Sequence, residues 1–335
     1  MLKFRILIDN RPARGSSTNC SEPTCNTCCP ALLSEHGLSI FIEYNGTRIL
    51  CDTGASPAFM ENAAALGTNL TGTDFCVISH GHSDHTGGLP ALLEKKEKKE
   101  KKEMTEITEM TEITEIAGGK FCVYLSGQIE NEKYYSSRRG LPRDISTDPQ
   151  VFAKHHSRLI PVWESRWITP EIAAVKCSCS SHPKPHGNKF LGATCCGHES
   201  TIISQEQSAL PYLISDDQFG HELALAINTP QGVAIFSPCS HNGLFNIIES
   251  AMEFTGASEL LAFVGGLHLV DGCETAQEIS DMARSFTEKY PGAQLFTGHC
   301  TGDMATEIFS SIFSHDALAS SPFHIFHTGF EQILS

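Results

Sequence analysis

A short loop rich in metal-binding side chains most restricts what this chain can fold into. Residues 75–78 are apolar and partly β-branched, which is typical of a buried strand. His80, His82, Asp84 and His85 follow within six positions. Imidazole nitrogens and carboxylate oxygens are the ligands of zinc-class ions outside thiolate sites, and two such ions at about 3.5–4 Å can share one site. We therefore expect a strand that ends in a metal-binding loop; a chance cluster of surface histidines is the weaker alternative.

Length and charge restrict the class of protein. A chain of 335 residues, 40% hydrophobic and 19% charged, can bury a large core as one big domain or two smaller ones. The net charge of −15 opposes binding to nucleic acid or to an anionic membrane. Bound cations would reverse the sign locally, so a small anionic substrate remains compatible with this charge.

The first ten residues are too short and too charged for a signal peptide, and no apolar run approaches the ~20 residues of a membrane helix. We therefore expect a cytoplasmic protein without a membrane partner. The 14 cysteines should then stay reduced. Some of them cluster in two loops, at Cys20, Cys25, Cys28 and Cys29 and at Cys177, Cys179, Cys195 and Cys196. These loops could hold a structural zinc or an iron–sulfur cluster, but free thiols are the simpler interpretation because one CxxC is a weak signal.

Periodicity predicts the elements around the loop. Residues 39–43 and 48–51 alternate on either side of Asn45-Gly46, a strong hairpin signal. Helical spacing is found at 57–66, 244–254, 275–290 and 304–313. Further strand-like segments also end at histidines: residues 233–236 precede Cys239 and His241, residues 260–264 precede His268, and residues 294–296 precede His299. Because strand ends deliver side chains to one edge of a layered fold, we expect these histidines to gather in one pocket.

The His-x-His-x-Asp-His motif resembles the metallo-β-lactamase superfamily, as does the Asp-Thr-Gly turn that begins at Asp52. Four more segments are similar to one narrower family, the archaeal dihydropterin–ribofuranosylaminobenzene phosphate synthases and their bacterial relatives: 34–39, 238–243, 265–269 and 298–302. The resemblance covers roughly residues 1–10, 32–93 and 211–335. It implies an α/β (α+β) fold, the four-layer αββα sandwich, as a single domain over 1–335. Three insertions would interrupt it: a Cys-rich loop at 11–31, a Glu/Lys/Thr triplet repeat at 94–117 that is helical or disordered, and an irregular Cys-rich segment at 161–210.

The resemblance also implies two metal sites. His80, His82 and His241 are assigned to one ion, and Asp84, His85 and His299 to the other. The superfamily usually places a bridging aspartate where this chain has Cys-Ser-His. Either His241 takes that place without a bridging carboxylate, or Cys239 is a ligand, and His221 is the alternative third histidine.

Other residues are expected around the ions. Asp52 should fix a ligand histidine, although it also suits an Asx turn. Glu35 and His36 are placed near the site only by the resemblance. We assign His268 to the substrate or its leaving group, and take Asp84 and His268 as the catalytic residues. Histidine rather than glutamate at position 82 favours zinc-type chemistry over that of the iron-using members, with Mn²⁺ or Fe²⁺ as alternatives.

The expected function is a metal-dependent enzyme that acts on a phosphate or diphosphate compound. The family resemblance implies transfer with pyrophosphate release, and a phosphodiesterase or other ester hydrolase is the alternative. A non-catalytic metal- or redox-responsive binding protein is a further alternative, and the charge disfavours an RNA-processing nuclease. The basic stretch at 127–160, which includes Arg138, Arg139, Arg143, His155 and Arg158, either lines the substrate cleft or forms a solvated helix face.

Overall fold

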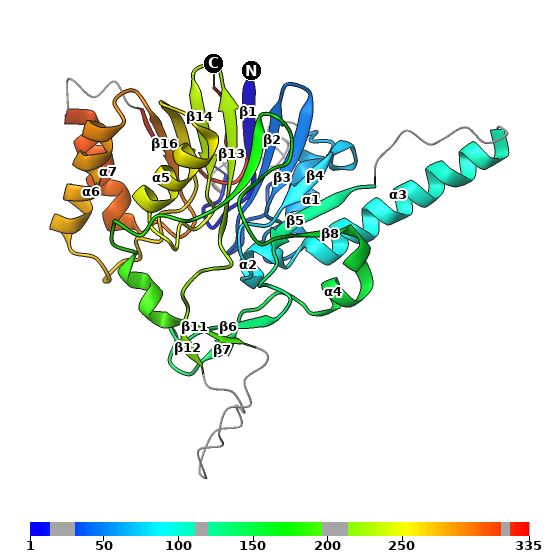
Figure 1. Ribbon diagram of the computed structural model, residues 1–335, viewed down its shortest axis with the longest axis horizontal. Coiled ribbons are helices and arrows are strands. Elements are labelled where there is room, and N and C mark those ends of the chain that lie inside the picture. Colours follow the sequence, from blue (N-terminus) through cyan, green and yellow to red (C-terminus); the bar gives the residue numbers. More distant parts are fainter. Residues whose placement is uncertain (14–30, 111–119, 196–213, 316–321, 335) are drawn as a thin grey trace, which may run out of the picture.

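The computed structural model describes residues 1–13, 31–110, 120–195, 214–315 and 322–334. Two seven-stranded mixed sheets form its centre (Figure 1). The first has the order β18-β1-β2-β3-β4-β5-β8, with β1 Leu2–Ile8, β2 Ser39–Tyr44, β3 Thr47–Cys51, β4 Phe75–Val77, β5 Cys122–Ser126, β8 Leu159–Val162 and β18 Glu331–Leu334. The second has the order β17-β16-β15-β14-β13-β10-β9, with β9 Arg166–Trp167, β10 Ile172–Lys176, β13 Leu223–Thr229, β14 Gly232–Phe236, β15 Leu260–Val264, β16 Gln294–Thr297 and β17 Phe323–Ile325.

Helices cover the outer faces of both sheets (Figure 1). They are α1 Ala58–Ala65, α2 Ser83–Thr86, α3 Leu89–Met110, α4 Gln150–His155, α5 Leu244–Thr255, α6 Ala276–Lys289 and α7 Asp303–His315, with short 3₁₀ turns at η1 Leu70–Gly72, η2 His156–Arg158 and η3 His186–Phe190. A small third sheet has the order β12-β11-β6-β7, with β6 Glu132–Ser136, β7 Arg143–Asp144, β11 Leu191–Cys195 and β12 Ser215–Asp216. It lies apart from the two large sheets, at the bottom of Figure 1.

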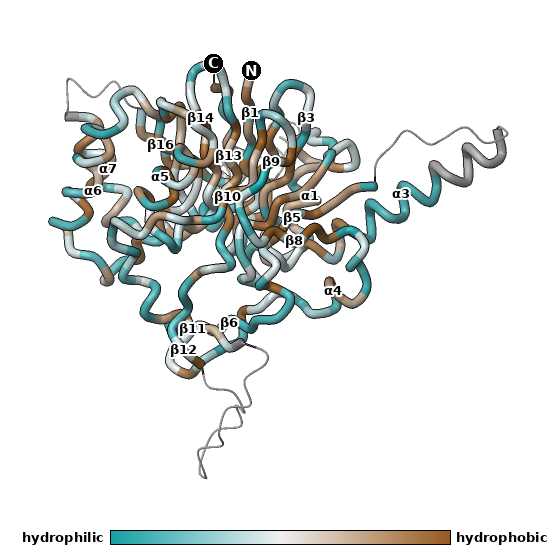
Figure 2. The backbone as a smooth tube through the Cα atoms, viewed as in Figure 1, coloured by the Kyte–Doolittle hydropathy of each residue, from teal (hydrophilic) through white to brown (hydrophobic). Residues whose placement is uncertain are grey.

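Three large hydrophobic clusters of the described residues hold the layers together. Between the sheets, the buried ring of Phe4 meets Phe236 and Phe296 edge-on, with centroids 5.7 and 5.2 Å apart. A second cluster joins the first sheet to α1 and α3, and a third joins the second sheet to α5, α6 and α7. Figure 2 shows the same pattern, with hydrophobic strands inside and hydrophilic loops outside. The predicted αββα sandwich is therefore confirmed. Within the described ranges, no helix is both long and apolar enough to span a bilayer.

The local predictions hold where the signal is strong. The β2–β3 hairpin turns at Asn45 and Gly46, whose φ angles of 49° and 86° are the left-handed pair that a two-residue hairpin needs. The predicted helices are all present, with ends shifted by a residue or two. The segment 161–210 differs from the prediction, because β10 is a buried strand that pairs with β13 inside the second sheet. Its Ile-Ala-Ala-Val run is short and rich in alanine, which gives little β signal.

The triplet repeat is helical in its described part, since α3 continues through it to Met110. Its first turns are anchored. Lys96 is buried and donates to the backbone oxygens of Thr71 and Thr73, and Arg158 donates to Glu97 and Glu100. Arg158 is therefore a packing residue rather than part of a substrate cleft. Residues 111–117 of the repeat, and most of the 11–31 insertion, lie outside the described residues.

Candidate metal centre

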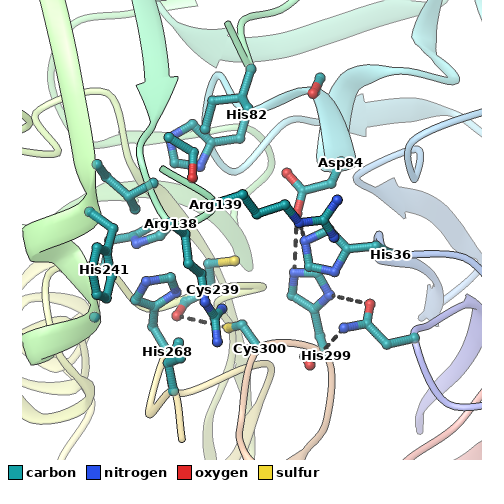
Figure 3. A pocket seen from close by; sticks show the side chains of 18 of the residues that line it. His36, His82, Asp84, Arg138, Arg139, Cys239, His241, His268, His299 and Cys300 are labelled. Atoms are coloured by element: carbon teal, nitrogen blue, oxygen red, sulfur yellow. Dashed lines mark hydrogen bonds and ion pairs between the residues drawn. The ribbon is translucent and has the colours of Figure 1, made fainter. Parts of the chain in front are cut away.

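A cavity of about 930 Å³ opens where the strands of both large sheets end (Figure 3). The loop after β4 brings His82 and Asp84 to its wall, with His80 and His85 of the same loop fully buried. The loops after β14, β15 and β16 bring the second set: Cys239 and His241, His268, and His299. Strands β14, β15 and β16 run parallel, as do β3 and β4, so these ends face the same side. Crevices at the carboxyl ends of parallel strands are where α/β sheets bind ligands.

The backbone is strained at these ends. Asp52, Ser240, His268 and His299 have φ angles of 60°, 59°, 51° and 51°, in the left-handed region that L-residues avoid. Each such residue costs on the order of 1–3 kcal/mol and persists where the surrounding structure imposes it, most often at functional sites. The strain identifies the four turns as parts of one constrained site.

Three buried histidines form the first part of the centre. The ring centroids of His80, His82 and His241 lie 4.5, 4.9 and 5.1 Å from one another. The Nε2 atom of each is buried and has no hydrogen-bond partner in the protein. A buried nitrogen without a partner is costly, and the cost of three together is removed by a cation that accepts all three lone pairs. The residues present therefore fit a metal ion.

The second part of the centre is equally compact. The Nε2 atoms of His85 and His299 are 3.1 Å apart, Cys239 Sγ is 3.3 Å from His85 Nε2, and Asp84 Oδ2 is 3.6 Å from both nitrogens. Ligands of one tetrahedral zinc ion, with bonds of about 2.0–2.3 Å, lie roughly 3.3–3.7 Å from one another. The spacing of these four side chains is therefore that of a metal ligand set.

Asp52 holds two of the imidazoles in the orientation that ligands need. Its Oδ2 accepts from His85 Nδ1 at 2.6 Å and from Ser79 Oγ at 2.6 Å, and Ser79 Oγ in turn accepts from His80 Nδ1 at 2.8 Å. With the proton assigned to Nδ1 in both rings, the Nε2 lone pairs point into the centre. The role expected for Asp52, to fix a ligand histidine, stays a prediction that uses these contacts.

Two asparagines hold the imidazole rings of His241 and His299 in a fixed orientation. The sequence did not lead us to predict either of them. Asn188 Oδ1 accepts from His241 Nδ1 at 3.1 Å while its Nδ2 donates to the His241 backbone oxygen at 2.8 Å. Asn10 pairs with His299 in the same way, at 3.1 and 3.0 Å. The two-point contact fixes both the amide and the ring. Asn10 is the second residue after β1, and a polar residue near a strand end is a sequence signal for a site residue. Asn188 lies in η3, where the sequence carries no such signal.

Asn188→Ala is expected to weaken zinc binding by about tenfold or more, because outer partners of ligand histidines typically contribute 10–100-fold to affinity. Competition with a chromophoric chelator measures the change. The exposed Asn131→Ala serves as the matched control and should bind zinc like the unaltered protein. Equal affinities for the two variants would contradict this role of Asn188.

Burial and mutual repulsion keep most of the histidines neutral. Burial lowers the pKa of His82 to about 3 and that of His299 to about 4, and it holds the pKa of His80 and His241 well below the usual value. Burial also lowers the pKa of His85, but Asp84 and Asp52 outweigh it and raise that pKa to about 9. Without a cation, His85 therefore carries the positive charge between two carboxylates. Neutral imidazole is the form that binds metals.

The alternative ligand His221 is occupied elsewhere. Its Nδ1 accepts from the Gly81 backbone N–H at 3.1 Å and its Nε2 lies 3.0 Å from Asp217 Oδ2, so neither nitrogen is free for a metal. The next residue, Glu222, accepts from the backbone N–H groups of His241 and Asn242 at 2.7 and 2.8 Å and holds that turn in place. These contacts favour His241 over His221 as the third histidine.

The remaining predicted residues fall into two groups. His36 and His268 border the cavity: His36 Nε2 is 3.4 Å from Asp84 Oδ2, and the His268 ring lies 4.2 Å from that of His241 with a buried, unpartnered Nδ1. Glu35 instead accepts from the backbone N–H groups of Ala55 and Ser56, so it shapes the adjacent turn rather than facing the ions.

Arginines form the outer wall of the cavity. Arg138, Arg139 and Arg143 come from the β6–β7 hairpin of the small sheet, and Figure 3 shows the first two extending over the histidines. No ion pair of these three with a carboxylate is present in the described part of the chain. His155 lies elsewhere, bound to Glu97 on α3. The basic stretch therefore divides into a cavity wall and a packing contact.

The thiol-rich loops are described only in part. Cys177 and Cys179 are free thiols beside α5. Cys20, Cys25, Cys28, Cys29 and Cys196 lie outside the described residues, and of Cys195 only the backbone is described. A metal site built from both loops therefore stays a prediction.

Comparison with known proteins agrees with this geometry. Residues 35–120 match the family model described as the metallo-beta-lactamase superfamily. A curated protein of Methanocaldococcus jannaschii named 7,8-dihydropterin-6-methyl-4-(beta-D-ribofuranosyl)-aminobenzene-5'-phosphate synthase is 27% identical over 290 residues, which cover 84% of this chain and 86% of the relative. An uncharacterised protein of the same archaeon is 23% identical, over 86% of this chain and 92% of its own.

A solved structure gives the same fold. The crystal structure of Tm1679, described as a metal-dependent hydrolase of the β-lactamase superfamily, matches with a TM-score of 0.67 at 22% identity and covers 100% of both chains. The fold of this structure and the match of residues 35–120 to the family model agree with each other. This chain has the metallo-β-lactamase fold, and its residues 35–120 match the model of that superfamily.

Proposed function

We propose that this protein is a dinuclear metalloenzyme, with zinc as the preferred metal, that acts on a small substrate carrying a phosphate or diphosphate group. One observation carries the proposal. The unpartnered Nε2 atoms of His80, His82 and His241 lie buried beside the Asp84–His85–His299 set, at the floor of an arginine-lined cavity. The first three residues would hold one ion and the second three the other. Bound there, divalent ions would supply Lewis acidity toward phosphate oxygens.

The chain's own residues divide the work. Arg138, Arg139 and Arg143 present the positive charge that binds and orients a phosphate group in a protein whose net charge is −15. Asp84 Oδ2 lies 3.6 Å from the Nε2 atoms of His85 and His299, at the end of the centre that faces the cavity. His268 borders the cavity with a free, buried Nδ1, which suits it to exchange a proton with a leaving group.

The curated relative suggests the finer reaction. Its name is that of a synthase that joins a dihydropterin-methyl unit to a ribofuranosylaminobenzene phosphate, and the proposed transfer would release pyrophosphate. The alternative is hydrolysis of a phosphodiester, which uses the same cavity with water as the attacking group. The arginine wall supports an anionic substrate in both cases.

One pair of assays tests the proposal. Zinc-loaded protein is supplied with dihydropterin-methyl diphosphate and ribofuranosylaminobenzene phosphate, and pyrophosphate release is followed; in parallel it is supplied with bis(p-nitrophenyl) phosphate. Turnover in the first assay supports the transferase, and turnover in the second alone supports the hydrolase. Absence of turnover in both would contradict a phosphate-directed enzyme.

The double variant Arg139→Gln/Arg143→Gln should raise KM for the anionic substrate by at least about tenfold with little change in kcat. Charge-assisted hydrogen bonds contribute about 1.5–3 kcal/mol each, and neither arginine is among the proposed metal ligands. Steady-state kinetics on the active substrate measures the shift. Lys154→Gln removes a positive charge from the basic stretch outside the cavity and should leave KM unchanged. A double variant with the original KM would contradict a role in substrate binding.

A further inference from the structure

We propose that the thiolate of Cys239 is the bridging ligand of the centre, shared by both metal ions. The inference rests on the proposed dinuclear centre and adds to it the ligand that joins its two halves. The sequence left two alternatives open at this turn, where the chain has Pro238-Cys239-Ser240: His241 takes the place of a bridging aspartate, or Cys239 is a ligand. The geometry points to the sulfur as the replacement for that aspartate.

The Cys239 sulfur is close to both ligand sets. Cys239 Sγ lies within 4.8 Å of the ligand nitrogens of His80 and His241, and it also lies within 4.8 Å of those of His85 and His299. The two sets have no other member in common. In Figure 3 the Cys239 side chain lies between His241 on one side and His299 on the other. A side chain placed between two ligand sets, with one donor atom that can bind two ions, is positioned to bridge them.

Imidazole nitrogens surround the Cys239 sulfur. His80 Nε2 and His241 Nε2 are buried and unpartnered, and these two histidines group with the sulfur within 4.8 Å. His85 Nε2 approaches the sulfur to 3.3 Å. Cys239 itself is 4% exposed. A small buried thiol surrounded by imidazole lone pairs has no apolar packing reason to be there, whereas a thiolate ligand does.

The contacts of the turn hold the Cys239 sulfur in this place. Gly266 N–H donates to Pro238 O at 2.8 Å, and Ser240 Oγ donates to Gly266 O at 2.6 Å. A Cβ atom on Gly265 would lie 1.8 Å from Ser237 O, so the following loop packs directly against this turn only because residue 265 is glycine. Ser240 is held in the left-handed region at φ 59°. The turn is therefore pre-organised to present Cys239 to the centre.

Cys300 is the competing thiol, and its position differs. Its Sγ groups with Cys239 and His268 at the cavity side. It packs against Gly266, where an added Cβ would lie 2.5 Å from the sulfur. Cys300 therefore contacts one edge of the centre, whereas Cys239 contacts both halves. On metal binding, the Cys239 thiol gives up its proton to solvent and its sulfur gains the metal bonds. Metal uptake should therefore release a proton that is not released by a variant without cysteine at position 239.

A bridging thiolate affects which metal ions the centre prefers to bind. Thiolate is a soft ligand that favours zinc, cobalt or cadmium over magnesium or manganese. Replacing the sulfur with a carboxylate should move the preference toward the harder ions. The protein's metal selectivity is thus expected to depend on this one atom.

Cadmium-113 NMR of the full chain tests the bridge directly. Two cadmium resonances from the centre are expected, both displaced downfield by thiolate ligation, and both should move upfield in Cys239→Asp. The Cys300→Ser variant is the matched control and should keep both downfield resonances. In cobalt-loaded protein, the near-ultraviolet thiolate-to-cobalt band assigned to the centre should likewise be lost in Cys239→Asp and kept in Cys300→Ser.

The results of these measurements distinguish a failure of the proposed bridge from a failure of the dinuclear centre. If only one resonance responds to Cys239→Asp, the thiolate is terminal and the proposed bridge is wrong. If neither responds although two ions are bound, Cys239 is not a ligand and the dinuclear centre stands without it. If the unaltered protein binds no metal in the cavity, both the bridge and the proposed function are wrong.

Discussion

His241→Ala is expected to lower kcat/KM by about three orders of magnitude and to reduce the bound metal by about one ion per chain. The substitution removes one of three buried Nε2 donors that have no partner in the protein. Lewis-acid catalysis contributes several kcal/mol, and about 4 kcal/mol corresponds to roughly a thousandfold in rate. Kinetics on the active substrate and elemental analysis of the purified variant measure the two effects.

His182→Ala controls for the loss of a histidine as such. His182 pairs with Glu249 on α5, away from the cavity, and its replacement should change neither metal content nor kcat/KM. If His241→Ala keeps both ions and the original rate, His241 is not a ligand, and the choice of His241 over His221 must be revised.

Asp52→Ala is expected to lower the free energy of unfolding by about 3–5 kcal/mol and to weaken zinc binding by about 10–100-fold. It leaves three buried donors without an acceptor, namely Ser79 N–H, Ser79 Oγ–H and His85 Nδ1–H, and it removes the carboxylate paired with a histidine that is positively charged in the metal-free protein. Alanine also tolerates φ 60° less well than aspartate. Urea denaturation of the metal-free protein and a chelator titration measure the two quantities.

Asp52→Asn separates the two contributions. Asparagine tolerates the left-handed backbone and keeps one acceptor oxygen, so its loss of stability should be clearly smaller than that of Asp52→Ala. It lacks the charge that orients His85 and, through Ser79, His80, so its zinc affinity should still fall. A stability loss below about 1 kcal/mol for Asp52→Ala would show that the carboxylate does not organise the folded site.

The parts of the site that the sequence predicted are local in the chain. The strand at 75–77 and its histidine loop, the Asn45-Gly46 hairpin, and the turns before His241, His268 and His299 all combine an apolar run with polar residues directly after it. Such patterns depend on neighbouring residues, which makes them readable from the sequence.

The missed parts depend on contacts between distant residues. Asn10 meets His299 across 289 positions, and Asn188 meets His241 across 53. Neither pairing leaves a periodic pattern. The basic stretch showed the same limit, because charge alone did not distinguish Arg139, on the cavity wall, from Arg158, which binds Glu97 and Glu100. The positions of both follow from the packing of α3 and of the small sheet.

Anomalous X-ray diffraction at the zinc edge, on crystals of the zinc-loaded protein, tests the central claim most directly. We predict two anomalous peaks within the cavity, one among His80, His82 and His241 and the other among Asp84, His85 and His299. A cavity without an anomalous peak, with zinc only at the thiol-rich loops, would contradict the dinuclear centre and the function proposed from it.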